Sequence, residues 1–153
     1  MKNTVIFLAI ITLLFSVPPV SAMKSHDHNN HSAQTDGDMG AMGFKHDAVV
    51  DGVRSEFQIM SLASMKMKDD QGRTHHIMVK LFDDKTQSEI MDAVGKIKII
   101  GPDGSEQESA LNNYSGIFAA NFTFAAKGKY GVICLLKVDG QKKLVKFWYN
   151  HHG

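Results

Sequence analysis

From Val49 onward, short apolar runs alternate with turn-forming residues about every ten positions, the spacing typical of all-β domains. The separators are DDQG, GPDG, NNYSG, AKGK and VDGQ, and no stretch has a long helical period. Six or seven strands with hairpin-length links predict an antiparallel immunoglobulin-like β-sandwich. The predicted strands are 55–67, 75–82, 95–100, 116–124, 129–138 and 142–150, with a short strand near 48–53.

Alternation within the strands predicts which side chains enter the core. In HHIMVKLF, Ile77, Val79 and Leu81 share one face, whereas His76, Met78 and Lys80 share the face towards water. Met60 and Trp148 are also expected in the core. Two later runs add core stripes, namely Tyr130, Val132, Cys134, Leu136 and Val138, and then Phe118, Ala120, Phe122 and Phe124.

The first 22 residues resemble a cleaved export signal. Lys2 precedes an apolar run of about 13 residues, which is too short for a comfortable membrane span of roughly 20. The alternative is an uncleaved anchor. Residues 23–47 are rich in Ser, Asn, Asp, Gly and His, which predicts a flexible His/Met-rich leader before a domain at 48–153. We therefore expect a periplasmic or secreted protein with no membrane span after cleavage.

The charge balance excludes some partners. Removing Lys2 from the 17 basic residues leaves 16, against 16 acidic residues, so no basic field would attract nucleic acid. Neither a Ser/His/Asp arrangement nor a phosphate loop is present, and an enzyme is not expected. Cys134 is the single cysteine, so an internal disulfide is impossible and a buried thiol is expected.

The stretch MKMKDDQGRTHHIM, residues 65–78, places methionines among charged residues. A two-residue turn at 71–72 would place Met67 opposite His76 and Met65 opposite Met78. Opposed side chains have Cβ atoms about 4.5–5.5 Å apart, close enough to share an ion. A three-residue loop would shift the pairing by one residue and break this square.

The residue types select the ion. Thioether sulfur is soft and suits Cu(I) or Ag(I), and imidazole suits Cu(I) and Cu(II) alike. Met65, Met67, His76 and Met78 are the expected ligands, with His75 auxiliary. His151 and His152 could approach this hairpin or form their own Cu(II) or Zn(II) site. A blue-copper site is disfavoured because no His or Met follows Cys134 until His151. Loose capture of ions is expected of the leader residues His26, His28, His31, Met39, Met42 and His46.

Two longer stretches, HHIMVKLFDDKTQSEIMDAVGKIKIIGPDG and YSGIFAANFTFAAKGKYGVICLLKV, carry a family resemblance. The chain resembles the exported YtkA-like group of Ig-like β-sandwich domains and, more loosely, small periplasmic copper-handling proteins. The resemblance implies a sandwich fold and envelope metal handling. It assigns structural roles to the matching residues Tyr114, Gly116, Phe118, Gly128 and Tyr130.

Together these patterns predict an exported copper-binding protein. It would act as a Cu(I) or Ag(I) chaperone or buffer in metal tolerance, or deliver the ion to an envelope transporter or metalloenzyme. The alternative is a binding module without metal, whose methionine-rich face contacts another envelope protein.

Overall fold

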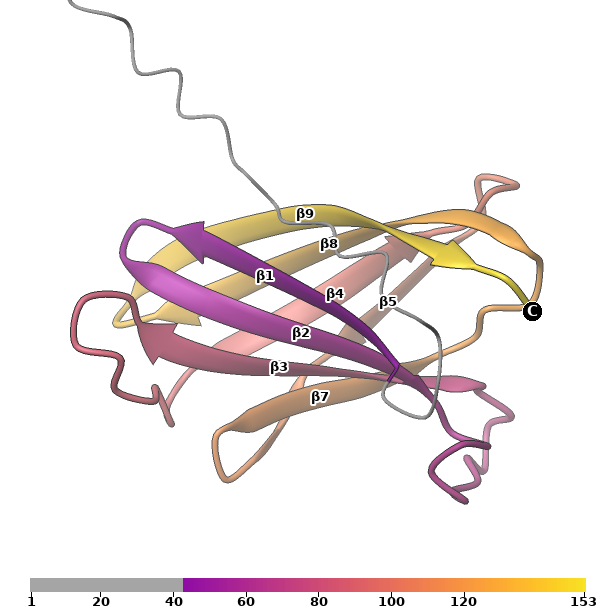
Figure 1. The fold of residues 1–153 in the computed structure, drawn as a ribbon, viewed down its shortest axis with the longest axis horizontal. Coiled ribbons are helices and arrows are strands. Elements are labelled where there is room, and N and C mark those ends of the chain that lie inside the picture. Colours follow the sequence, from indigo (N-terminus) through magenta and orange to yellow (C-terminus); the bar gives the residue numbers. More distant parts are fainter. Residues whose placement is uncertain (1–42) are drawn as a thin grey trace, which may run out of the picture.

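The computed structural model describes residues 43–153, which form two antiparallel β-sheets packed face to face (Figure 1). The prediction of an all-β antiparallel sandwich is confirmed. One sheet has the order β1-β2-β3-β7-β6, with β1 at Phe44–Val50, β2 at Val53–Ser61, β3 at His75–Asp83, β7 at Ile117–Phe122 and β6 at Asn112–Tyr114. The other has the order β5-β4-β8-β9, with β5 at Glu106–Ala110, β4 at Val94–Ile100, β8 at Gly128–Val138 and β9 at Gln141–His151.

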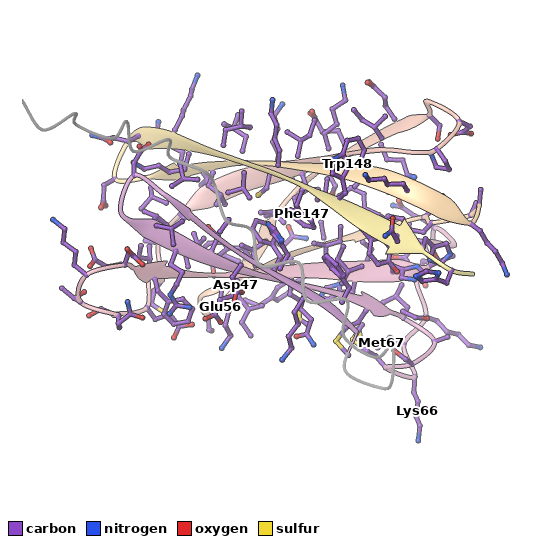
Figure 2. All side chains as sticks on the ribbon, turned by 45° about the horizontal axis from the view of Figure 1, so that its top comes forward. Asp47, Glu56, Lys66, Met67, Phe147 and Trp148 are labelled. Atoms are coloured by element: carbon purple, nitrogen blue, oxygen red, sulfur yellow. The ribbon has the colours of Figure 1, made fainter. Side chains whose placement is uncertain are left out.

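The core lies between the sheets and follows the predicted alternation. All three predicted core stripes are buried, and the fully enclosed side chains include Ile77, Val132 and Cys134. Phe147 extends this core from β9 (Figure 2). It packs against Phe57 of the opposite sheet, with ring centroids 4.9 Å apart.

Two hairpins have the turn chemistry that their sequences specify. Asp51 and Gly52 join β1 to β2, and Asp139 and Gly140 join β8 to β9. All four residues have positive φ, as the tight two-residue turn between twisted strands requires. Asp-Gly suits this backbone because glycine has no Cβ and aspartate tolerates the left-handed region.

The hairpin predicted at residues 65–78 is wrong. β2 ends at Ser61, which pairs with His75, and Met60 pairs with His76. Residues 62–74 form a loop in place of continued strands and a two-residue turn. Burial of Leu62 anchors the loop, and its consecutive charged residues suit a strand poorly, so the longer connection is favoured over the short hairpin.

Other boundaries also differ from the predictions. Within residues 43–153 the sandwich has nine strands, and β5 and β6 escaped prediction because their polar sequences, EQESA and NNY, carry no apolar alternation. β1 begins at Phe44, inside the predicted leader. Across these described residues, no helix is long and apolar enough to cross a membrane.

Two residues that were predicted to lie in the core lie outside it. Trp148 is 53% exposed, on the outer side of the four-stranded sheet, because β9 alternates it with buried Phe147 and Tyr149 (Figure 2). Met60 is half-buried on the outer face of the five-stranded sheet, since it pairs with His76 and shares that residue's face.

Candidate metal centre

Met67, His76 and Met78 line one groove of about 420 Å³ on the outer face of the five-stranded sheet. His76 and Met78 are two positions apart on β3, so strand alternation turns both outward. Met67 comes from the 62–74 loop and lies on the same outer side (Figure 2). Three of the four predicted principal ligands are therefore brought together, although not by the predicted hairpin.

The 62–74 loop reaches the groove through a helical turn. The backbone N–H of Met65 donates to Ser61 O at 3.3 Å, and that of Met67 donates to Leu62 O at 2.9 Å. Lys66 between them has φ +56°, a left-handed conformation that breaks the alternation of a strand. Met67 is 51% exposed and borders the groove, whereas Met65 is not among the groove's lining residues.

Asp69 closes the loop on itself. Its Oδ1 accepts the backbone N–H of Gln71 at 2.9 Å and that of Arg73 at 3.2 Å. The Arg73 guanidinium also donates to both carboxylate oxygens at 2.7–2.9 Å. These hydrogen bonds lower the pKa of Asp69 well below its usual range, with the Arg73 side chain the largest cause. The carboxylate therefore stays charged to a lower pH than a free aspartate would, and its hydrogen bonds join three residues across the loop end.

A hydrogen-bond chain joins this loop to His76. Asn121 on β7 donates its Nδ2 hydrogen to Asp69 Oδ2 at 2.8 Å, since a carboxylate can only accept. The Asn121 oxygen is then the atom that faces His76 Nδ1, so that nitrogen carries the proton and donates it. The lone pair is left on His76 Nε2, available to a metal. A metal-binding histidine commonly donates its other N–H in this way, which fixes the ring.

His75 lies on the opposite side of β3 from His76. It is 8% exposed and faces the space between the sheets, so it cannot assist the groove as an auxiliary ligand. Its ring centroid lies 5.0 Å from that of His151, at the end of β9, with the rings perpendicular. Burial, and then the nearby His151, lower the pKa of His75 to about 4, so the ring is neutral at pH 7.

The two tail histidines border a second cavity, of about 430 Å³, which His75 also lines. His151 Nδ1 lies 3.4 Å from the Tyr149 hydroxyl, and burial together with His152 and Lys127 lowers the pKa of His151. The tail therefore approaches His75, not the methionine groove. Among the described residues, no three His, Cys, Asp or Glu side chains gather into a ready metal cluster.

His46 was predicted to belong to a loose metal-capturing leader, and the structure gives it another place. It lies in β1, is 3% exposed and stacks on Phe147 with ring centroids 4.2 Å apart. Its desolvation lowers its pKa, partly opposed by Asp47. The other leader histidines and methionines, His26, His28, His31, Met39 and Met42, lie outside the described residues, as does the export signal.

Asn121 and Tyr114 are groove residues that the sequence reasoning missed. Asn121 alternates with buried Ala120 and Phe122 in β7, so its outward position could have been predicted from the sequence. Its role could not, because it depends on the pairing of β7 with β3. Tyr114 was assigned a structural role by resemblance, yet it is largely exposed beside the groove. Cys134 is fully buried, which raises the pKa of its thiol to about 12 and keeps it inert.

Comparisons with known proteins show the fold alone. No protein-family model matches the sequence, and no curated protein matches it. The resemblance to the YtkA-like group therefore stays a prediction.

One similar solved structure is a copper-bound variant of FetP from uropathogenic Escherichia coli strain F11, at 11% identity and TM-score 0.56, covering 73% of this chain and 96% of that chain. Another is the PmoD soluble domain from Methylocystis sp. ATCC 49242 (Rockwell), at 15% identity and TM-score 0.42, covering 73% of this chain and 99% of that chain. The chain thus shares its sandwich architecture with FetP.

Proposed function

We propose that this protein is exported and binds Cu(I) at the groove formed by Met67, His76 and Met78, acting as a copper carrier or buffer. The observation that carries the proposal is the convergence of two thioethers and one imidazole on a single open groove. These three side chains come from β3 and from a loop, so folding brings them together.

The donor set favours a soft monovalent ion. Thioether sulfur binds Cu(I) and Ag(I) well, whereas hard ions such as Mg²⁺ and Ca²⁺ prefer oxygen ligands. Methionine needs no deprotonation before it binds a metal, and it forms no disulfide in an oxidising compartment. Ag(I) would bind the same groove, and Cu(II), with a single imidazole available there, would bind more weakly.

The groove is also prepared for an ion before one arrives. Asp69 holds the 62–74 loop against Asn121, and Asn121 fixes the protonated nitrogen of His76. Such outer partners lower the cost of ordering the ligands when a metal binds. The copper in the similarly folded FetP structure adds support at the level of the fold.

Exposure suits exchange of the ion with a partner. Met67 is half exposed, and Tyr114 beside the groove is exposed as well. An incoming transporter or metalloenzyme could therefore reach the ion without unfolding the sandwich. This open geometry favours a carrier or buffer over a permanent storage site.

The test is a Cu(I) titration against a competing chelator, with the M67L/M78L double variant and a matched M60L/M65L control. Leucine preserves volume and removes the sulfur, so both variants should keep their fold. We expect the first to lose about a hundredfold or more in affinity, since even outer-partner changes cost 10–100-fold. Equal affinities for the two double variants would overturn the groove as the site.

A second function is favoured by the same exposure. Met67, Met91 and Tyr114 are large apolar side chains exposed on or beside the five-stranded sheet. Such a face could contact another envelope protein without any metal, because methionine adapts to varied surfaces. A partner captured equally by the wild type and by M67L/M78L, in the absence of copper, would favour this role.

A further inference from the structure

The end of the sandwich near the last residue of β9 holds a pair of histidines that the methionine groove does not use. His75 opens β3 and His151 ends β9, and each faces the space between the two sheets. They are far apart in sequence and lie in different sheets, so only the packing of the sandwich brings them together.

The spacing of the two rings suits a shared ion. Their centroids are 5.0 Å apart and their planes are perpendicular. Two imidazoles bound to one ion through nitrogens at about 2.0–2.1 Å, with a near-tetrahedral angle, place their centroids roughly 5 Å apart. The separation of the two rings therefore matches that of a shared ion, and rotation of the side chains would turn their nitrogens toward it.

Neighbouring residues fix both rings. His75 packs edge-on against Phe124, with centroids 5.0 Å apart, and its Nδ1 lies 2.8 Å from the Thr74 hydroxyl. That hydroxyl oxygen also accepts the backbone N–H of Phe124 at 3.0 Å. His151 Nδ1 has the Tyr149 hydroxyl at 3.4 Å. In each ring a polar partner lies at Nδ1, which leaves Nε2 for a metal.

The surrounding cavity has room for an ion with water. It measures about 430 Å³, and Ser61, Ser64 and His152 line it together with the histidine pair. His152 is exposed at its edge and could supply a third nitrogen by turning inward. The described residues contain no ready cluster of three such ligands, so the site would be an open, exchangeable one.

From this arrangement we propose a second metal site, in which His75 and His151 bind a borderline divalent cation, Cu(II) or Zn(II). Both ligands are imidazoles, which suit these ions, and no thioether lines this cavity to favour a soft monovalent ion. The site is separate from the Met67/His76/Met78 groove, because β3 turns the consecutive residues His75 and His76 to opposite faces. It does not depend on the proposed Cu(I) function.

The test uses the full chain in a background in which His26, His28 and His31 are changed to Asn, so that leader residues cannot bind the probe. Cu(II) is titrated and its electron paramagnetic resonance spectrum recorded. We expect one bound ion coupled to at least two imidazole nitrogens. H75N and H151N should each lower the affinity tenfold or more and remove one nitrogen coupling. H46F removes a buried imidazole of β1 that lines neither this cavity nor the methionine groove, so it is the control and should leave both unchanged.

Several results would overturn the site. These are an unchanged affinity and spectrum in both H75N and H151N, an equal loss in H46F, or a loss in H151N while a folded H75N binds normally. H75N alters a buried position, so near-ultraviolet circular dichroism must confirm its fold. H151N, at the half-exposed end of β9, decides the question if H75N does not fold. Cu(I) affinity, measured in parallel, should be unchanged in H151N, which separates this site from the groove.

Discussion

His46 shows how one buried titratable side chain contributes to stability. His46 lies in β1 and its ring is buried against the aromatic core, where it stacks on Phe147. Burial there disfavours the charged form of the ring. The folded state therefore binds the proton less readily than the unfolded state, whose histidine has a pKa near 6.5. The contribution of neutral His46 to the free energy of unfolding is therefore complete above about pH 6.5. It is lost as the pH falls from there towards the lowered pKa of the folded state.

We predict that H46F flattens the acid side of the stability curve. Phenylalanine keeps the stack on Phe147 but cannot be protonated, so the free energy of unfolding should fall less steeply below about pH 6.5. The reduction is at most about 1.4 kcal/mol per pH unit, the limit for one titrating group. Urea unfolding at a series of pH values measures it. His75, with its pKa near 4, should leave a residual slope, and an H46F curve parallel to that of the wild type would contradict the prediction.

For individual residues, the sequence was informative about chemical type and about whether a side chain faces the core or the solvent. The parity of HHIMVKLF placed His76 and Met78 on the outer face of β3, and both line the groove. Residue type failed for Trp148, because its apolarity suggested the core, whereas the alternation of β9 turned this side chain outward. The partner of His76 could not be read at all, since Asn121 is 45 residues away.

Among the elements, the 62–74 loop decides the methionine groove. It is closed at its base by the backbone N–H of Leu62, which donates to Thr74 O at 2.9 Å, and Leu62 is buried. Its far part is held by Asp69, through Arg73 within the loop and Asn121 on β7. The position of Met67 therefore depends on the backbone bonds of the helical turn and on the Asp69 carboxylate.

We predict that D69N loosens this loop and weakens Cu(I) binding about 10–100-fold, the range for outer partners of a metal site. Asparagine lacks the charge that pairs with Arg73, so amide hydrogen exchange should rise across residues 62–74 but not in β3. The low pKa of Asp69 means that the wild-type loop should stay protected until the pH falls below about 4, where the free carboxyl would itself protonate. Unchanged exchange together with unchanged affinity would contradict this role.

The strands with apolar alternation could be predicted from the sequence, whereas the connection between β2 and β3 could not. Six apolar runs became strands with boundaries mostly close to those predicted, because alternation reports burial directly. The two-residue turn failed because the sequence could not weigh a short hairpin against a longer loop anchored by buried Leu62. That choice depends on tertiary contacts, which override local propensity.

The described domain is held together by one core between two sheets, and Cys134 is a fully buried member of it. This thiol is fully enclosed, and burial raises its pKa to about 12, so both access and ionisation are suppressed. It is the only cysteine in the chain, which makes it a single internal reporter of global opening.

We predict that Cys134 does not react with an aromatic disulfide reagent in the native protein at pH 8 and reacts fully in denaturant. The thiolate is the reactive form, and opening of the sandwich is needed to form and expose it. The reaction rate should rise in proportion to the equilibrium constant of unfolding across mild urea concentrations. Rapid labelling under native conditions would show that the sheets separate locally around β8. A C134A variant, inert throughout, is the control.

The fold class, the core stripes and the chemistry of the outward face of β3 could be read from the chain alone. They follow from local alternation and from the residue types themselves, which need no knowledge of distant partners. Three further features required the folded molecule: a loop, not a hairpin, supplies Met67, Asn121 orients His76, and His75 meets His151 between the sheets. Each of these features depends on strand register and on sheet packing between segments distant in sequence. The sequence pattern allows several such arrangements equally, and small differences in burial energy select one of them.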